Sequence, residues 1–344
     1  MSTRIILCGV GGVGRNVTRL LNARPDYEVV AAYSRNPQLT GSDMGELAGI
    51  GPLRVVVTGD RRLALEHPAD ALVVATASYL RDVADDLRAG VDRGLDVVTT
   101  AEEAAFPWLA DGELANELDR HAVDHDVSIL GAGLNPGFIF DTLLLTLSGI
   151  AWDVRHIQVR RVSDISRFSA TIQRRLGLGY SLAEFQSQID AGAITGHIGF
   201  RQGFALVAHC MGRKLDRIEE SFEPVVADAD FETENLAVVA GQTAGFIQRT
   251  RGMVDGEPWI EAEFIPQAGS SSGGGYAFED SISIDGLNPV SLAISPACQP
   301  QLGTAAMIGN CIPRVIEARP GFRTVADLAL PFARPTRSDL LRFD

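Results

Sequence analysis

Lysine is almost absent from this sequence: of its 30 basic residues only Lys214 is a lysine, and the others are arginine. Lysine is the side chain that forms Schiff bases with carbonyl substrates, and it often serves as a catalytic acid or base. Lys214 follows a predicted helix in the segment MGRKLD, where we expect a solvated cation. The composition therefore argues against mechanisms that depend on lysine.

Cysteine is also scarce. Cys8, Cys210, Cys298 and Cys311 are scattered and show neither a metal-ligand spacing nor a disulfide pattern. Cys8 lies inside an apolar segment and is expected in the core. No apolar run reaches the length of a membrane span, and no signal peptide precedes the first predicted strand. We therefore expect a cytoplasmic protein with no membrane partner.

Basic residues are outnumbered by acidic ones, 30 against 44, which gives a formal net charge of −14. This balance argues against nucleic acid or an anionic membrane surface as a partner. The 344 residues are enough for two domains, and the hydrophobic and charged fractions of 46% and 22% are ordinary for globular proteins. The composition predicts a globular chain of two domains.

The beginning of the chain has the pattern of a strand–helix–strand unit. Residues 4–8 (RIILC) predict a buried parallel strand, and residues 13–21 predict the helix that follows it. Residues 27–33 (YEVVAAY) predict the second strand. The loop GVGGVG joins the first strand to the helix, so its G-x-G-x-x-G pattern stands in the context that makes it informative.

Each glycine of this loop has an expected role in a dinucleotide site. Gly9 makes the tight turn, Gly11 lets the backbone approach a pyrophosphate, and Gly14 packs the helix against the strand. Gly12 and Val13 belong to the same turn, where the helix N-terminus offers free N–H groups to phosphates. The alternative is a structural glycine turn. Because the whole frame is present, we expect a dinucleotide to bind here.

Ser34, Arg35 and Asn36 follow the second strand and indicate which dinucleotide is preferred. A site for NAD usually has Asp or Glu at this point to hold the ribose 2′-hydroxyl. Ser34 instead supplies a hydroxyl, and Arg35 a guanidinium suited to a 2′-phosphate. The alternative is that Arg35 stacks on the adenine and NAD is also accepted. We predict NADP as the preferred cofactor, with NAD possible.

Strand and helix patterns alternate up to about residue 150, which predicts a doubly wound parallel sheet of the Rossmann type. Further strands are expected at residues 53–58, 71–75, 95–99 and 127–131. Helices are expected between them at residues 61–67, 79–93 and 113–125. Residues 1–150 thus form the predicted NAD(P)-binding domain, completed by a C-terminal helical segment at residues 303–330.

Residues 151–302 have long strand patterns with a few helices, which predicts an α+β domain with a mainly antiparallel sheet. We expect this domain to bind substrate and to form dimer contacts. The glycine- and serine-rich stretch at residues 269–275 is interpreted as a loop between strands. The predicted fold class is therefore α/β with a second α+β domain.

Ligands of such parallel sheets bind at the carboxyl ends of the strands, so the loops there hold the candidate site residues. Thr100-x-x-Glu103 fits a capping box in which Glu103 reaches back to the N–H of Thr100. Glu102 is then left to point over the cofactor, where a nicotinamide enzyme needs a proton donor or acceptor. Glu102 is our candidate catalytic residue, the alternative being a second acid at a helix N-terminus. Residues expected to contact the cofactor from these loops are Thr76, Ala77, Ser78, Thr100, Ala101, Asn135 and Gly137.

The triplet Asn135-Pro136-Gly137 precedes a helix expected at residues 138–147. One interpretation is structural, with Asn135 as N-cap and Pro136 at the first helical position. The other is that the triplet presents backbone and amide groups to the nicotinamide carboxamide. Both interpretations stay open.

The remaining candidates concern metals and substrate. His121 and His125 are spaced i,i+4, but no third ligand is apparent, so we expect a surface pair and no metal site. Arg161 and Arg167 are candidates for binding a substrate carboxylate. A mostly apolar substrate pocket is expected at the domain interface, although such aromatics are often plain core. Its candidate residues are Phe138, Phe140, Arg161, Phe168, Ile172, His197, Phe200 and Thr304.

Five motifs occur in an order typical of one family: GVGGVG, SRN, TTAEEAAFP, NPGF and GTAAMIGNCIP. With them the chain resembles the 2,4-diaminopentanoate dehydrogenase group, which includes the native amine dehydrogenases and has dihydrodipicolinate reductases as distant relatives. The resemblance implies an NAD(P)-binding Rossmann domain joined to a sheet-rich domain, a homodimer, and interconversion of amines with carbonyl compounds and ammonia. It also implies that Glu102 is the catalytic carboxylate. Its cofactor positions correspond to Gly9, Gly11, Gly14, Ser34, Arg35 and the loop at residues 76–78.

Departures from neighbouring families narrow the prediction. Residues 160–175 lack the His-His-x-x-Lys run of dihydrodipicolinate reductases, and Ala101-Glu102-Glu103 replaces the Glu-Lys-Pro of sugar dehydrogenases of the glucose–fructose oxidoreductase type. Homoserine and saccharopine dehydrogenases also depend on lysine. We therefore predict an NADP-preferring amine dehydrogenase whose partners are ammonia and a small carbonyl or amine substrate. The alternatives are a diaminopentanoate-type amino-acid dehydrogenase, an imine or carbonyl reductase, and a non-catalytic NADP-binding regulatory protein.

Overall fold

The computed structural model describes residues 2–268 and 277–337, so the stretch at residues 269–275 lies outside the described residues. The chain divides into two compact units. The first unit comprises the residues up to Thr142 and those from Pro300 onward, and the second comprises Leu143–Gln299. No helix in the described chain has both the length and the apolarity needed to cross a membrane.

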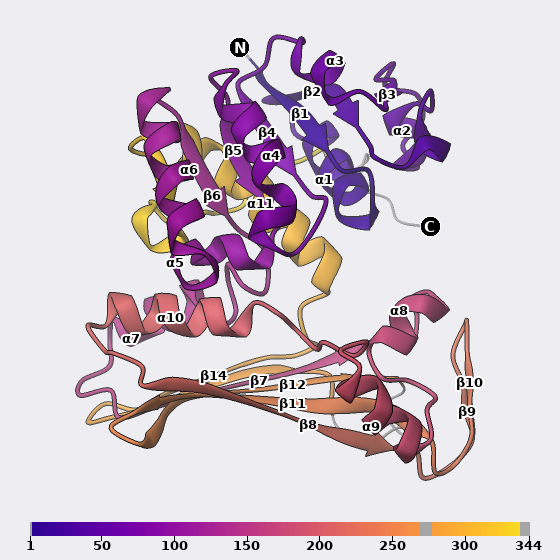
Figure 1. Ribbon diagram of the computed structural model, residues 1–344, viewed down its shortest axis with the longest axis vertical. Coiled ribbons are helices and arrows are strands. Elements are labelled where there is room, and N and C mark those ends of the chain that lie inside the picture. The colour runs from indigo at the N-terminus through magenta and orange to yellow at the C-terminus, as the bar shows by residue number, and fades with distance from the viewer. Residues whose placement is uncertain (1, 269–276, 338–344) are drawn as a thin grey trace. The chain divides into compact units, whose positions relative to one another are not determined.

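The first unit is built on a seven-stranded sheet in which all neighbouring strands are parallel (Figure 1). The strand order is β15–β6–β5–β4–β1–β2–β3. The strands are β1 Thr3–Cys8, β2 Tyr27–Tyr33, β3 Val57–Thr58, β4 Ala71–Val74, β5 Asp96–Thr99, β6 Ser128–Gly131 and β15 Gly321–Arg323. The predicted Rossmann sheet is confirmed, and β15 adds a strand that was not predicted.

One predicted strand is much shorter than expected. The apolar run at residues 53–58 forms a strand only at Val57–Thr58. Arg54 interrupts the extended backbone because its φ is +61°, in the left-handed region. The hydrophobic pattern was therefore correct about burial at Val55 and Val57 but wrong about the length of the strand.

Helices bury the sheet of the first unit. α4 (Leu80–Val91) and α6 (Gly112–Asp124) pack with buried side chains of β4, β5 and β6, including Leu72 and Val97. α11 (Pro300–Ile316) packs against α1 (Gly12–Asn22) and contacts β4, β5 and β6. The other helical segments of this unit are η1 Pro37–Leu39, α2 Met44–Leu47, α3 Arg61–Leu65, η2 Glu102–Ala105, α5 Pro107–Ala110 and η3 Val325–Asp327. α7 (Thr142–Ser148) begins at the division between the units and belongs, from Leu143 on, to the second unit.

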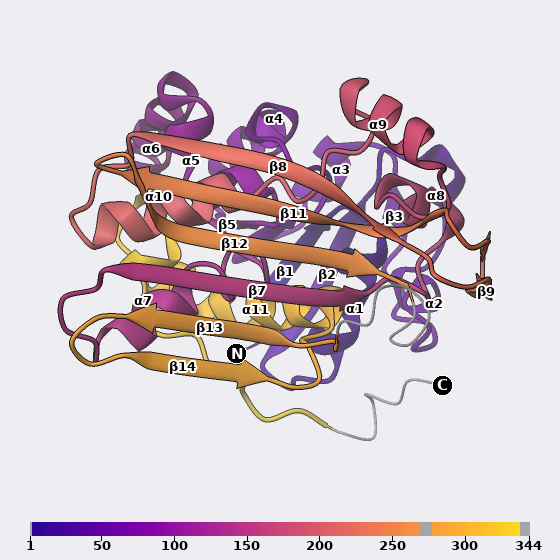
Figure 2. The same cartoon turned by 90° about the horizontal axis from the view of Figure 1, so that it is seen from below.

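The second unit is a six-stranded sheet in the order β14–β13–β7–β12–β11–β8 (Figure 2). Among its described strands only β7 and β12 pair in parallel, so the mainly antiparallel α+β architecture is confirmed. The strands of this sheet are β7 His156–Asp164, β8 Arg217–Val226, β11 Thr243–Val254, β12 Glu257–Gln267, β13 Asp280–Asp285 and β14 Val290–Ile294. β9 Phe231–Glu232 and β10 Ala237–Val238 form a separate two-stranded antiparallel sheet. Its helices are α8 Ala170–Arg175, α9 Leu182–Asp190 and α10 Phe200–Cys210.

Candidate functional site

The glycine-rich loop lies between β1 and α1, and its backbone permits little other than glycine at two positions. Gly9 has a φ of +108°, and a Cβ there would lie 2.3 Å from the carbonyl oxygen of Ala75. A Cβ at Gly14 would lie 2.1 Å from the carbonyl oxygen of Gly9. The loop is therefore held tightly against the end of β4 and against its own helix.

The same loop has the properties of an anion site. Gly11 and Gly12 are exposed, and a Cβ at Gly11 would meet no atom within 4 Å, so the backbone is open to an approaching group. The N-terminus of α1 has no side-chain cap and no acidic residue in its first turn. The buried Thr76 hydroxyl, whose methyl group faces Gly9, has no hydrogen-bond partner within the described residues. These features fit the pyrophosphate of a dinucleotide.

Arg35, just after β2, pairs with a carboxylate that the sequence analysis had not singled out. The Nη2 atom of Arg35 lies 2.7 Å from Oδ2 of Asp86, and Nη1 of Arg61 lies 2.7 Å from Oδ1 of the same residue. Asp86 is fully buried in α4. The sequence feature that could have identified Asp86 is the position of an acidic residue on the apolar face of α4, between Val83 and Gly90. The Oγ atom of Ser34 accepts the N–H of Asn36 at 3.2 Å.

The capping box predicted at Thr100 and Glu103 is wrong. The turn that follows β5 begins one residue later than expected, with Ala101 at the N-cap position and no side-chain cap. The nearby hydroxyl that accepts a backbone N–H is that of Thr99, which binds the N–H of Ala101 at 3.1 Å. Glu103 accepts the N–H of Leu80 at 2.8 Å and so stabilises the beginning of α4 instead of its own turn.

Glu102 has a different partner. Its Oε1 atom accepts the hydroxyl of Ser78 at 3.1 Å, and its side chain is half-buried. Ser78 follows β4, and Glu102 follows the neighbouring strand β5. Two loops that follow neighbouring strands thus meet at the carboxylate that the sequence selected, while Glu103 is committed to a structural role.

The helix expected at residues 138–147 begins only at Thr142, so the prediction of Asn135 as N-cap and Pro136 as first helical residue is wrong. The Asn135–Pro136 peptide is cis, and Gly137 has a φ of +122°, which no helix accommodates. Asp141, a residue that the sequence analysis missed, accepts the N–H of Gly137 at 2.6 Å and also that of Thr142. Burial raises the pKa of Asp141 to about 6.

The candidate pocket residues are distributed between the two units. In the first unit Phe138 is half-buried, Phe140 is a fully buried core residue, and the Thr304 hydroxyl accepts the N–H of Leu134 at 3.3 Å. In the second unit the ring of His197 stacks on that of Phe200, with centroids 4.8 Å apart. The backbone of His197 is held on both sides by the amide of Gln248. Phe168 is half-buried and Ile172 is exposed.

Arg161 was predicted to line the pocket and bind a carboxylate, and the structure contradicts this. Its guanidinium is 1% exposed and lies 2.7 Å from Oδ1 of Asp280, which is equally buried. It also donates to the carbonyl of Cys298, whose N–H binds the other Asp280 oxygen at 2.8 Å. Arg161 therefore has a structural ion pair inside the sheet, whereas Arg167 stays exposed, 3.9 Å from Glu234.

The expectation that His121 and His125 lack a third metal ligand is also wrong. Asp92, at the end of α4, lies 2.8 Å from Nε2 of His121, and the ligand atoms of the three residues lie within 4.8 Å of one another. Asp92 and His125 are exposed, and Nδ1 of His125 bonds the carbonyl of His121. These contacts are a side-chain hydrogen bond between Asp92, which follows α4, and α6, and a hydrogen bond at the end of α6.

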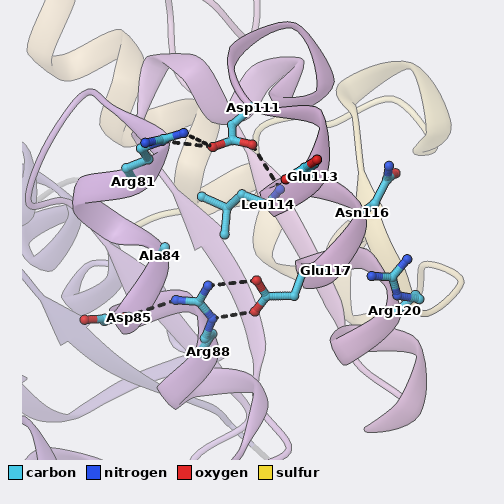
Figure 3. A pocket seen from close by; sticks show the side chains of 10 residues that line it. All are labelled: Arg81, Ala84, Asp85, Arg88, Asp111, Glu113, Leu114, Asn116, Glu117 and Arg120. Atoms are coloured by element: carbon cyan, nitrogen blue, oxygen red, sulfur yellow. Dashed lines mark hydrogen bonds and ion pairs between the residues drawn. The ribbon is translucent and has the colours of Figure 1, made fainter.

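A groove of about 750 Å³ lies between α4 and α6, and no predicted site residue lines it (Figure 3). Several of its charged side chains pair with one another. Arg81 lies 2.7 Å from Asp111, and Arg88 lies 2.8 Å from Glu117. These two ion pairs connect α4 with α6 and its N-cap residue, so both arginines that α4 contributes to the groove are paired with acids.

Two stretches that together make up most of the chain match known protein families. Residues 138–339 match the 2,4-diaminopentanoate dehydrogenase C-terminal domain, and residues 3–100 match the N-terminus of dihydrodipicolinate reductase. The chain is 33% identical to the 2,4-diaminopentanoate dehydrogenase of Acetoanaerobium sticklandii, over 96% of this chain and 94% of that protein. It belongs to the 2,4-diaminopentanoate dehydrogenase family.

Amine dehydrogenases also resemble this member of the 2,4-diaminopentanoate dehydrogenase family over almost its whole length. The amine dehydrogenase of Streptomyces virginiae is 24% identical over 94% of this chain and 96% of that protein. The structure of amine dehydrogenase from Mycobacterium smegmatis superimposes with a TM-score of 0.84 and 26% identity, covering 98% of each chain. The family resemblance is confirmed, and the chain is an oxidoreductase of the kind that acts on amines.

Proposed function

We propose that this protein is an NADP-preferring amine dehydrogenase, which reductively aminates small ketones and aldehydes with ammonia and catalyses the reverse deamination. Family membership supports the reaction class. The observation that carries the proposal is the half-buried Glu102, hydrogen-bonded to Ser78 at the carboxyl ends of β4 and β5. The glycine-rich loop follows β1, the strand next to β4, so carboxylate and dinucleotide loop share one edge of the sheet.

The residues of the first unit fit a nicotinamide dinucleotide. Bound NADPH would supply the hydride. The glycine-rich loop would hold the pyrophosphate, and Ser34 and Arg35 would meet the ribose 2′-phosphate. The residues proposed to lie along the rest of the cofactor are Thr76, Ala77, Ser78, Thr100, Ala101, Asn135 and Gly137.

Glu102 would perform the proton transfers. As a carboxylate it accepts a proton from ammonia as the nitrogen adds to the substrate carbonyl. It returns that proton to the carbonyl oxygen, which becomes the hydroxyl of a carbinolamine. A second proton, which Glu102 takes from an ammonium ion, lets this hydroxyl leave as water, and the negative charge of Glu102 stabilises the cationic iminium that remains. Ser78 donates its hydroxyl to Oε1 of Glu102 and so orients the carboxylate. Since ammonia offers few contacts, this positioning contributes directly to the rate.

The proposed substrate class depends on which arginines can bind a substrate carboxylate. Arg161 is neutralised by Asp280 and cannot anchor a substrate carboxylate, while the other candidates for the pocket are mostly apolar. This favours a simple ketone or aldehyde. A second candidate is the oxidation of 2,4-diaminopentanoate, favoured by the 33% identical relative of that name. The exposed Arg167 is the arginine from the sequence analysis that stays available to bind the carboxylate.

The test follows NADPH absorbance with a panel of small ketones and aldehydes, with and without concentrated ammonium. 2,4-Diaminopentanoate with NADP+ is assayed in the reverse direction. Oxidation of NADPH that requires ammonium supports the proposal, and oxidation without ammonium indicates a carbonyl reductase instead. Tight NADPH binding with no turnover of any substrate indicates a regulatory protein and contradicts the proposal.

A further inference from the structure

A buried carboxylate in the first unit joins two arginines from different elements. Arg35 follows β2, Arg61 is the first residue of α3, and Asp86 lies in the second half of α4. Each oxygen of Asp86 accepts from one guanidinium at 2.7 Å. The Asp86 side chain is 1% exposed, but the side chains of Arg35 and Arg61 are 51% and 37% exposed. Both guanidiniums therefore bind Asp86 with one part and keep another part open to solvent.

The charges of this cluster do not cancel. A buried carboxylate is costly unless it is paired, and one arginine would be enough to neutralise it. The second arginine leaves a net charge of +1 and holds two cations close together at the surface. The cations repel one another, and Asp86 between them offsets that repulsion. Such an arrangement is suited to bind an anion with more than one negative charge.

The position of the cluster indicates which anion. Arg35 and Arg61 follow β2 and β3, which are neighbours in the sheet, and Arg35 is adjacent to Ser34. Cys8, the last residue before the glycine-rich loop, lies beside Asp86, and the burial of the thiol together with the negative charge of Asp86 raises the pKa of Cys8. In a Rossmann sheet the adenosine ribose lies at the end of the second strand, so its 2′ position faces this edge.

We propose that Arg61 acts with Arg35 as a two-guanidinium site for the ribose 2′-phosphate, and that Asp86 is the positioning residue that holds both side chains. The inference rests on the proposed NADP-binding function and adds a specificity residue to it. Arg61 contributes hydrogen bonds and charge to the phosphate. Asp86 contacts no ligand and acts by fixing the two guanidiniums in advance, which lowers the entropy lost on binding.

The test measures binding of 2′,5′-ADP and 5′-AMP to the full chain by titration calorimetry, which does not depend on turnover. Arg61→Ala is expected to weaken 2′,5′-ADP binding about 10-fold or more and to leave 5′-AMP within about twofold, since one charged hydrogen-bonding group is lost. Arg62→Ala is the matched control, because it removes the same charge one residue further along α3. Arg62→Ala should leave the affinity for both ligands unchanged.

Two further variants separate positioning from charge. Arg61→Lys keeps the charge but not the fork of donors, and should fall between wild type and Arg61→Ala. Asp86→Asn should weaken 2′,5′-ADP binding although both arginines remain, and thermal unfolding shows whether this variant is folded. If Asp86→Asn does not fold, the Arg61→Ala and Arg61→Lys variants still test whether Arg61 binds the 2′-phosphate.

The outcomes distinguish this inference from the function on which it rests. If wild type prefers 2′,5′-ADP and Arg61→Ala keeps that preference, the role of Arg61 is overturned while NADP preference stands. If wild type binds both ligands equally, the proposed NADP preference itself fails, and the two-guanidinium site fails with it.

Discussion

The hydroxyl of Ser78 lies 3.1 Å from Oε1 of Glu102 and connects the loop after β4 with the turn after β5. This contact gives the proposed catalytic carboxylate a fixed orientation. It also separates Glu102 from its neighbour Glu103, which binds the N–H of Leu80. Two adjacent glutamates thus have different partners and different expected effects when they are replaced.

Replacing Ser78 should affect turnover more than stability. Ser78→Ala removes the hydrogen bond that orients Glu102, and the loss of about 1.4 kcal/mol corresponds to a roughly 10-fold lower kcat. Ser78→Thr keeps the hydroxyl and should restore most of the rate. Steady-state kinetics on the best substrate, with cofactor affinity measured separately, checks this. Equal rates in wild type and Ser78→Ala would show that the contact does not orient the carboxylate.

Replacing Glu103 should affect stability more than turnover. Glu103→Ala leaves the N–H of Leu80 at the beginning of α4 without its partner, which should lower the free energy of unfolding by about 1 kcal/mol. Glu103→Gln retains an acceptor oxygen and should lose less. Urea unfolding measures the difference. A Glu103→Ala variant as stable as wild type would show that the hydrogen bond between Glu103 and the N–H of Leu80 does not contribute to stability.

Asp141 should make stability depend on pH. Burial raises its pKa from 3.8 to about 6, so the folded state holds a proton that the unfolded state has released. The contribution of Asp141 to stability is therefore highest below about pH 4 and falls by about 3 kcal/mol as the pH rises through about 6. Asp141→Asn cannot ionise, so its stability relative to wild type should increase over this range. Denaturant unfolding of both proteins at several pH values checks this prediction. A difference in the free energy of unfolding that does not change with pH would contradict it.

Arg161 should behave as a structural residue. Arg161→Ala leaves Asp280 buried without its partner and should lower the free energy of unfolding by about 3–5 kcal/mol. The double variant Arg161→Met/Asp280→Leu removes both charges and should recover much of this loss. Chemical denaturation of the single and double variants provides the comparison. A stable Arg161→Ala variant with a raised KM would instead return Arg161 to the substrate site.

The parts of the site that depend on local backbone requirements could be predicted from the sequence. Gly9 and Gly14 are needed because neighbouring backbone atoms exclude a Cβ, and the motif encodes that requirement directly. Glu102 could be selected because strands and helices alternate clearly up to the end of β5. The residue at which the turn begins, with Ala101 as N-cap, could not be predicted, because helix boundaries are uncertain by a residue or two. A shift of one residue is enough to change which side chains cap the turn.

Contacts between distant residues explain the remaining errors. Arg161 and Asp280 are 119 residues apart in the sequence. An arginine that binds a substrate and an arginine that pairs with a buried acid cannot be distinguished from the sequence. Asp86 pairs with Arg35 and Arg61 across 51 and 25 residues. The sequence did place an acid on the apolar face of α4, which implies a cationic partner, but 29 arginines in the chain left the partner undetermined.

The most direct test of the proposed function compares Glu102→Gln with Glu103→Gln in ammonium-dependent oxidation of NADPH, with NADPH affinity measured for both. Both substitutions remove one negative charge from adjacent positions. Loss of a proton-transfer residue should lower kcat for Glu102→Gln by a factor of about 100 or more, with NADPH affinity near that of wild type. Glu103→Gln should stay near the wild-type rate. If Glu102→Gln keeps its activity, or if both variants lose it equally, Glu102 is not the catalytic carboxylate.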